Sequence, residues 1–196
     1  RDSISHDFLS FLDYQNIMPV LIPNHHSHAL ELADYADILI LSGGNDLTMN
    51  SDYGVNTEAE FTSAVSTRNN IEIKLIEKFI SKSKPIFGIC HGLQIINHFF
   101  GGTLHKIKSK NLHVATEHTI KMVGDDSKAW FGENDLLVNS YHNFGVDKLG
   151  KDLDIMALSK DGEIESFSHK REKIMAVMWH PERKFSDEKS REHNKN

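Results

Sequence analysis

The single cysteine of the chain, Cys90, lies in a pattern that gives its thiol a chemical role. An apolar run at 86–89 has the length and composition of a buried strand, and an apolar helical pattern begins at Leu93. Gly88 and Gly92 flank Cys90 two residues away on each side, the Gly-x-Cys-x-Gly spacing of a nucleophile elbow. Such a turn lifts a side chain out of the sheet edge, and the helix N-terminus beside it favours the thiolate. Taken alone, Cys90 fits a buried small hydrophobe about equally well.

A second apolar strand pattern, at 174–179, ends in His180, Pro181 and Glu182. With Cys90, these residues supply a Cys-His-Glu triad, in which the histidine takes the thiol proton, later gives it to the leaving amine, and is oriented by the carboxylate. Residues i and i+2 of a strand point to the same side, so His180 and Glu182 can share an edge. The alternative for Glu182 is a surface residue that follows a strand ended by Pro181. The combined pattern favours Cys90 as the nucleophile.

Four motifs extend this pattern along the chain: Ser-Gly-Gly-Asn-Asp at 42–46, Gly-Ile-Cys-His-Gly-Leu-Gln at 88–94, Asn-Ser-Tyr-His at 139–142 and Trp-His-Pro-Glu at 179–182. In this order they resemble the class I glutamine amidotransferase superfamily. Gly-Gly-Thr-Leu at 101–104 and Tyr53-Gly54 resemble its γ-glutamyl hydrolase branch, which includes the hydrolases of γ-glutamyl-γ-aminobutyrate. Each motif alone is weak, and their combination is specific.

The resemblance implies hydrolysis of a γ-glutamyl amide through a thioester on Cys90, with release of glutamate. It implies an oxyanion hole made by the backbone N–H groups of Gly44 and His91. The resemblance also implies that the loop after 139–142 binds the glutamyl group through its backbone. The substrate-binding residues expected on this basis are Gln94, Ser140, Tyr141 and His142. No metal ion and no organic cofactor is needed for this chemistry.

Two positions leave alternatives open. His142 has a purely structural role as its alternative, because motif residues often shape a loop without touching a ligand. Phe144 departs from many γ-glutamyl-γ-aminobutyrate hydrolases, which have a glutamine near this point. The leaving group therefore stays open among a γ-glutamylated polyamine or aminobutyrate, a folyl-type γ-glutamate, and a γ-glutamyl phosphoramidate on a nucleotide.

Two other functions also remain open. A glutaminase subunit that hands ammonia to a separate synthetase would use the same triad, and a synthetase partner is expected only in that case. A non-catalytic regulatory homologue is disfavoured, because Cys90, His180 and Glu182 each have a chemical role and no evident role in packing. Turnover of glutamine against larger γ-glutamyl amides would separate the first alternative from a free-standing hydrolase.

Composition restricts the partners. The 196 residues carry a net charge of −6, which argues against nucleic acid or an anionic membrane as the main partner. One cysteine permits no internal disulfide, as expected in a reducing cytoplasm. No run approaches the roughly 18 apolar residues of a membrane span, and no leader pattern is visible. We expect a cytoplasmic enzyme with a small-molecule γ-glutamyl substrate, and a homodimer stays an open alternative.

The chain length predicts a single domain, residues 1–196, with a charged tail at 185–196, and the resemblance implies that it is a glutamine amidotransferase-like catalytic domain. We expect a three-layer α/β sandwich with a mostly parallel central sheet between helices, flavodoxin-like by resemblance, and the active site at the carboxyl ends of the strands. The expected elements are helices at 6–16 and 69–83, strands at 18–23, 38–41, 117–123 and 136–142, and a hairpin of 155–159 with 163–168.

Three further segments carry expectations. Nothing before Asp7 can form the short buried strand with which this family usually begins, so an N-terminal strand is expected to be missing from this chain. The polar stretch 45–67 is long for an idle loop and is interpreted as a substrate-facing flap. The histidines at 24–28 lack a second ligand motif and are interpreted as solvated loop residues rather than a metal site.

Overall fold

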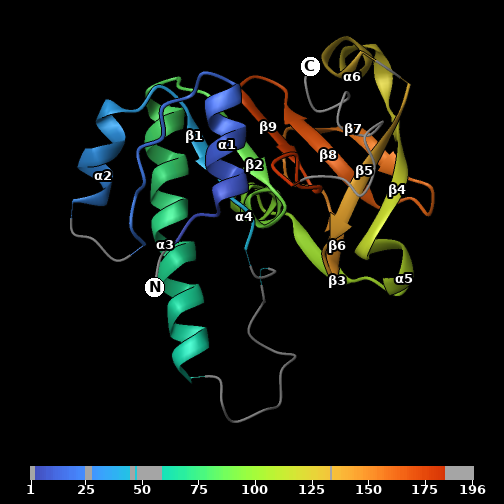
Figure 1. The fold of residues 1–196 in the computed structure, drawn as a ribbon, viewed down its shortest axis with the longest axis horizontal. Helices are drawn as coiled ribbons and strands as arrows, with labels where there is room; N and C mark the ends of the chain where they lie inside the picture. The colour runs from blue at the N-terminus through green and yellow to red at the C-terminus, as the bar shows by residue number, and fades with distance from the viewer. Residues whose placement is uncertain (1–2, 25–27, 45–46, 48–58, 133, 184–196) are drawn as a thin grey trace.

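A computed structural model describes residues 3–24, 28–44, 47, 59–132 and 134–183 of the protein (Figure 1). The helices are α1 (His6–Tyr14), α2 (Ala29–Leu32), α3 (Ala59–Ser81), α4 (His91–Phe99), α5 (Lys110–His113) and α6 (Gly124–Phe131), with a 3₁₀ turn at Ala33–Tyr35. The strands are β1 (Leu39–Leu41), β2 (Ile86–Ile89), β3 (Thr103–Lys106), β4 (Val114–Met122), β5 (Asp135–Tyr141), β6 (Phe144–Lys148), β7 (Leu153–Ser159), β8 (Ile164–His169) and β9 (Ile174–Val177).

The described strands form a seven-stranded sheet in the order β1-β2-β9-β8-β7-β4-β5, and β3 pairs with β6 beside it. The β1–β2 and β2–β9 pairs are parallel, while all pairs from β9 to β5 are antiparallel. The predicted α/β class is therefore confirmed, with less parallel pairing than expected. The predicted hairpin at 155–168 accounts for part of this difference, since a short connection can join only antiparallel neighbours.

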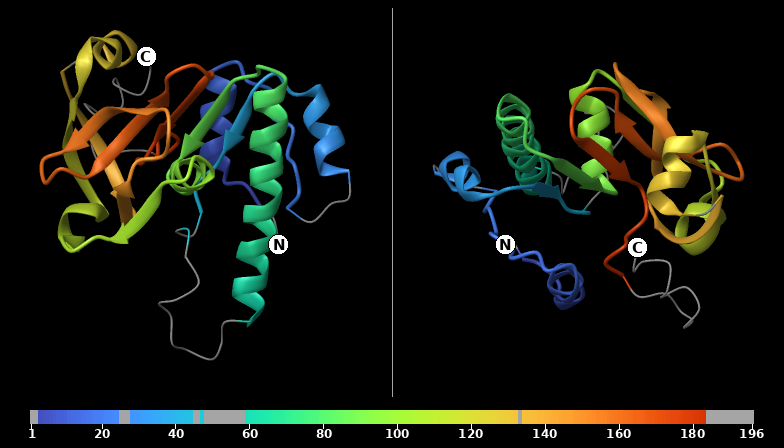
Figure 2. Two further views of the ribbon diagram at one scale, coloured as in Figure 1. Left: turned by 180° about the vertical axis from the view of Figure 1, so that it is seen from behind. Right: turned by 90° about the horizontal axis from the view of Figure 1, so that it is seen from above.

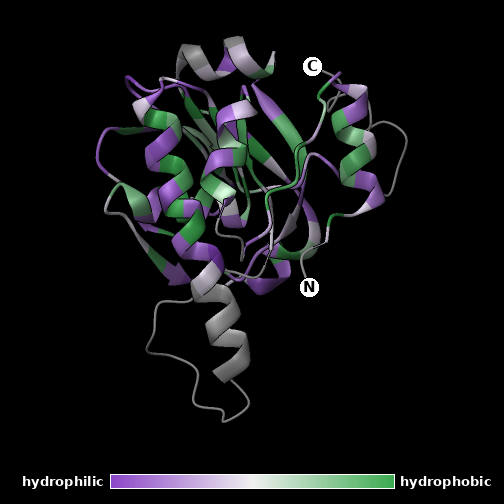
Figure 3. Ribbon diagram, turned by 90° about the vertical axis from the view of Figure 1, so that its left-hand side faces the viewer, coloured by the Kyte–Doolittle hydropathy of each residue, from purple (hydrophilic) through white to green (hydrophobic). Residues whose placement is uncertain are grey.

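Helices cover both faces of the parallel half, as predicted for a three-layer fold. The view from above in Figure 2 shows α1 on one side of the strands and α3 and α4 on the other. Strand alternation sends Ile86 into the core beneath α3 and α4, and Ile89 into the core beneath α1. Figure 3 shows the hydrophobic residues gathered on the central strands and on the inward sides of these helices. Both faces of the elbow strand are thereby fixed by packing.

The expected strand at 18–23 is wrong. This segment has no regular secondary structure, and Met18 and Leu21 are exposed. A strand needs a hydrogen-bonded neighbour, and within the described residues β1 is the edge strand of the sheet, with β2 on one side and no strand on the other.

The expected flap at 45–67 is corrected at its end. Residues 59–67 belong to α3, which begins ten residues before the predicted helix start at 69, and most of the remaining flap lies outside the described residues. The tail at 185–196 lies wholly outside them. None of the described helices is long and apolar enough to cross a membrane.

Candidate active site

Cys90 occupies the turn between β2 and α4, where the strand-to-helix geometry expected of an elbow is present. Its φ of 52° and ψ of −101° are strained for a residue with a β-carbon. A Cβ on Gly88 would lie 2.8 Å from the carbonyl oxygen of Gly92, and one on Gly92 would collide with the carbonyl oxygen of Leu41. The two glycines are therefore required for close approach of the backbone, as their spacing predicted.

His180 and Glu182 lie together at the carboxyl end of β9, the strand beside β2. The Nδ1 atom of His180 is 2.6 Å from Oε1 of Glu182, and both side chains are buried. A carboxylate accepts a hydrogen bond from this nitrogen, so Nδ1 carries a proton and Nε2 is left as the basic atom of the neutral ring. Because Ile89 pairs in register with Val177, Cys90 and His180 follow neighbouring strands at the same edge of the sheet.

Asn139, in β5, holds the backbone of His180 from the other side. Its side-chain amide donates to the carbonyl of His180 at 2.8 Å and accepts from the N–H of His180 at 2.9 Å. The ring of Tyr141 stands edge-on to the His180 ring, with centroids 5.8 Å apart. The Asn-Ser-Tyr-His motif thus positions the histidine, a role for Asn139 that the sequence analysis did not identify.

The turn that contains Gly43 and Gly44 runs between the His180 ring and the guanidinium of Arg68. A Cβ on Gly43 would collide with Cε1 of His180, and one on Gly44 would collide with Nη1 of Arg68. Arg68 donates to the carbonyl of Ser42 at 2.6 Å and to that of Gly43 at 3.3 Å. The predicted oxyanion segment is therefore beside the histidine, and an arginine fixes its backbone.

Glu72 connects this arginine to the elbow. Its Oε1 accepts from Nε of Arg68 at 2.8 Å, and its Oε2 is 2.9 Å from Nε2 of His91. Burial disfavours the charged form of Glu72, but hydrogen bonds and attraction from His91 and Arg68 outweigh burial and hold the pKa of Glu72 below its ordinary value. Sequence reasoning missed this pair, although the i,i+4 spacing of Arg68 and Glu72 on a predicted helix was a signal.

The four residues expected to bind substrate have different environments. Tyr141 is 42% exposed beside His180, whereas Gln94, Ser140 and His142 are fully buried. Ser140 donates its hydroxyl hydrogen to the carbonyl of His113, and the amide oxygen of Gln94 accepts from the N–H of Leu47 at 2.6 Å. For Ser140 and His142, substrate binding remains a prediction that concerns their backbone.

The chain belongs to the peptidase C26 family, whose model matches residues 1–182, and this places it among hydrolases. It is similar to a γ-glutamyl-CDP-amidate hydrolase of Campylobacter jejuni subsp. jejuni, with 32% identity over 173 residues that cover 87% of this chain and 74% of that protein. It is also similar to the glutamine amidotransferase-like protein YvdE of Lactococcus lactis subsp. lactis, with 30% identity and coverage of 92% and 82%.

Among solved structures, the chain resembles a glutamine amidotransferase of Thermotoga maritima. The TM-score is 0.66 at 20% identity, and the match covers 89% of this chain and 69% of that one. At this identity the likeness shows the fold alone. It agrees with the flavodoxin-like architecture expected from the class I glutamine amidotransferase motifs.

Proposed function

We propose that the protein is a cysteine hydrolase that cleaves γ-glutamyl amides and releases glutamate. The observation that carries this proposal is the buried 2.6 Å contact of His180 Nδ1 with Glu182, at the sheet edge where the strained Cys90 turn also lies. Such a pair leaves Nε2 of His180 able to take a thiol proton. The family and the named activity of the Campylobacter relative support the γ-glutamyl half of the substrate.

Acylation begins when His180 takes the proton of Cys90 and the thiolate attacks the γ-carbonyl carbon. The carbonyl oxygen gains the negative charge, and the backbone N–H groups of Gly44 and His91 donate to it. The carbon–nitrogen bond then breaks, the leaving nitrogen takes the proton from His180, and a γ-glutamyl thioester remains on Cys90. Glu182 stabilises the imidazolium that exists between these two steps.

Deacylation repeats these roles with water. His180 removes a proton from water as it attacks the thioester, and the same two N–H groups bind the second oxyanion. Collapse of this intermediate expels the Cys90 thiolate and frees glutamate, and the proton on His180 returns to the thiolate to restore the resting pair. Cys90, His180 and water account for every proton that moves in these two steps, so the proposed reaction operates without an organic cofactor.

For the leaving group we favour a γ-glutamyl phosphoramidate of a nucleotide over a simple γ-glutamyl amine. The support is the 32% identity to the γ-glutamyl-CDP-amidate hydrolase over 87% of this chain. A small-molecule substrate and a free thiol as nucleophile also fit a reducing, cytoplasmic setting. No synthetase partner is required for this reaction.

A panel of substrates, each assayed for released glutamate, tests both the γ-glutamyl hydrolase activity and the proposed leaving group. It should contain glutamine, γ-glutamyl-γ-aminobutyrate, γ-glutamylputrescine and a γ-glutamyl nucleotide phosphoramidate, each with Cys90→Ala as the control. We expect the highest kcat/KM with the phosphoramidate and no turnover by the variant. Glutamine as the best substrate would favour the glutaminase alternative, and turnover of none by the wild type would contradict the proposed function.

A further inference from the structure

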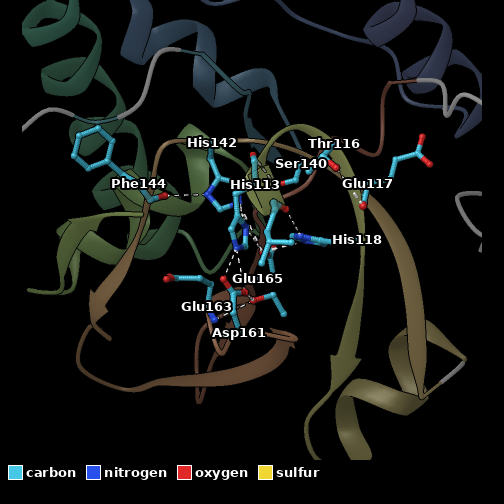
Figure 4. A network of polar contacts seen from close by, with 12 residues as sticks. His113, Thr116, Glu117, His118, Ser140, His142, Phe144, Asp161, Glu163 and Glu165 are labelled. Carbon is cyan, nitrogen blue, oxygen red and sulfur yellow. Dashed lines mark hydrogen bonds and ion pairs between the residues drawn. The ribbon is translucent and has the colours of Figure 1, made fainter. Parts of the chain in front are cut away.

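Four ionisable side chains from separate segments point toward one another behind the β5–β6 turn (Figure 4). They are His113 at the end of α5, His118 in β4, His142 after β5 and Glu165 in β8. The side chains of His113, His142 and Glu165 are 0% exposed, and that of His118 is 11% exposed. The proposed reaction uses none of these four side chains, so the cluster needs its own explanation.

The outward nitrogen of each imidazole is bound to an oxygen that can only accept. Nδ1 of His142 is 3.0 Å from the carbonyl of Phe144, and Nδ1 of His118 is 2.8 Å from the carbonyl of Leu112. Nε2 of His113 is 3.1 Å from both carboxylate oxygens of Asp161. In the neutral imidazoles these three nitrogens can carry the ring protons, and the inward nitrogens are then available as ligands.

The inward atoms form a triangle of the size that a small cation fills. Nδ1 of His113 lies 3.3 Å from Nε2 of His142 and 3.5 Å from Oε1 of Glu165. The third side, from Nε2 of His142 to Oε1 of Glu165, is 3.7 Å. Tetrahedral ligands about 2.1 Å from a Zn²⁺ ion are separated by about 3.4 Å. One ion can therefore reach all three atoms with little movement of the side chains.

The carboxylate of Glu165 faces three imidazoles at ion-pair distance, but none of them makes a hydrogen bond of good geometry with it. Within the described residues, neither carboxylate oxygen of Glu165 has a hydrogen-bond partner, and Nε2 of His118, 3.2 Å from Oε1 of Glu165, has none. Burying a carboxylate without a hydrogen bond or an opposite charge is costly. Lone pairs that converge on a buried carboxylate repel it unless a proton or a metal cation lies between them.

We propose that His113 Nδ1, His142 Nε2 and Glu165 Oε1 bind a divalent transition-metal ion, Zn²⁺ in the first instance. Imidazole and carboxylate ligands suit Zn²⁺, and Nε2 of His118, 3.2 Å from Oε1 of Glu165, is a candidate for its fourth position. The contact of Asp161 with His113 is the outer carboxylate–histidine contact that orients metal ligands. This site is separate from the metal-free chemistry proposed for Cys90.

The ion would join α5, β8 and the β5–β6 turn. Among the described strands of the sheet, β7 and β4 lie between β8 and β5, so no strand pairing joins β8 to the β5–β6 turn directly. His142 directly follows Tyr141, whose ring contacts His180, and it lies three residues after Asn139, which holds the His180 backbone. The metal therefore has a structural role that positions the end of β5. This inference does not rest on the proposed function, because binding is measured without substrate.

The test uses full-length protein without a histidine tag, stripped with a chelator and then titrated with Zn²⁺ against a chromophoric competitor. We expect one Zn²⁺ per chain, a higher Tm with Zn²⁺ than without, and the visible absorption of tetrahedral Co²⁺ when cobalt replaces zinc. If the protein takes no Zn²⁺ from the competitor and Zn²⁺ does not change the Tm, the proposal is overturned. Protons shared among the histidines and Glu165 would then explain the cluster.

Variants locate the ion. Glu165→Gln and His113→Gln should abolish stoichiometric binding, and Asp161→Asn should weaken it about 10–100-fold, the usual effect of removing an outer carboxylate. His105→Gln is the matched control, because His105 pairs with Glu163 at 2.8 Å nearby and is not part of the triangle. If a ligand variant fails to fold, Asp161→Asn still decides: unchanged affinity in that folded variant contradicts the assignment.

Discussion

Glu72 and His91 are joined by a 2.9 Å contact between Oε2 and Nε2, and both side chains are buried. The other oxygen of Glu72 binds Arg68, which in turn holds the carbonyls of Ser42 and Gly43. One carboxylate thus connects the two backbone segments that we propose as oxyanion donors. Its removal should disturb both donors at once, although it touches neither reacting atom.

The first prediction concerns Glu72→Gln. We expect kcat to fall about tenfold with little change in KM, because misplaced donors weaken transition-state binding more than ground-state binding. Asp34→Asn is the control, since Asp34 is an exposed carboxylate that pairs with Lys78 and Lys82 and belongs to neither proposed donor segment. Steady-state kinetics check both variants. Equal kcat values in wild type and Glu72→Gln would exclude a role for Glu72 in positioning the oxyanion donors.

The second prediction is a pH dependence of stability. The pKa of Glu72 is lower in the folded chain than its ordinary value of 4.5, so the unfolded chain binds this proton first as the pH falls. The contribution of Glu72 is present above about pH 4.5 and is lost as the pH falls through the folded-state pKa. Urea unfolding should therefore show the stability gap between wild type and Glu72→Gln shrinking below that pH. A difference in unfolding free energy between the two proteins that stays constant as the pH falls would contradict this prediction.

Local pattern was enough to predict the elbow and the pairing of His180 with Glu182. The strand ends at Cys90, the glycine spacing and the i,i+2 relation of His180 and Glu182 are all properties of adjacent residues. The fold class followed in the same way from alternating apolar strands and helical patterns.

Contacts between residues that are far apart in the sequence could not be predicted from local pattern. Asn139 and His180 are 41 positions apart, and Glu72 and His91 are 19 apart, so only the packed fold brings them together. The strand predicted at 18–23 is wrong for a related reason. Its composition fits a strand, but strand formation depends on a neighbouring strand that the local sequence does not specify. The proposed metal ligands His113, His142 and Glu165 also come from three separate segments, so only the fold brings them together.

The third prediction concerns Gly44→Pro, which removes the proposed N–H donor. Losing one oxyanion donor costs about 10²–10³ in turnover, and substrate binding should change little. Circular dichroism must first show that the fold is intact, because proline can distort the turn held by Arg68. A folded variant with the wild-type rate would exclude Gly44 as a donor.

The fourth prediction compares Glu182→Gln with His180→Ala. Glu182 orients His180, whereas His180 carries the proton, so His180→Ala should lower kcat more than Glu182→Gln. Glu182→Gln should leave Cys90 open to alkylation, more slowly at neutral pH. Turnover and alkylation rates measured against pH decide this. A Glu182→Gln enzyme that matches wild type at every pH would reduce the triad to a Cys90–His180 dyad.

The covalent intermediate tests the central claim most directly. Wild-type protein is mixed with a γ-glutamyl substrate, quenched in acid during the first turnover, and measured as the intact chain and as peptides by mass spectrometry. We predict one γ-glutamyl group per chain, located on Cys90, the only cysteine, and removed by hydroxylamine. Prior treatment with one equivalent of a thiol alkylator should prevent both the adduct and glutamate release. Full activity in Cys90→Ser, or undiminished glutamate release from the alkylated enzyme, would contradict the account.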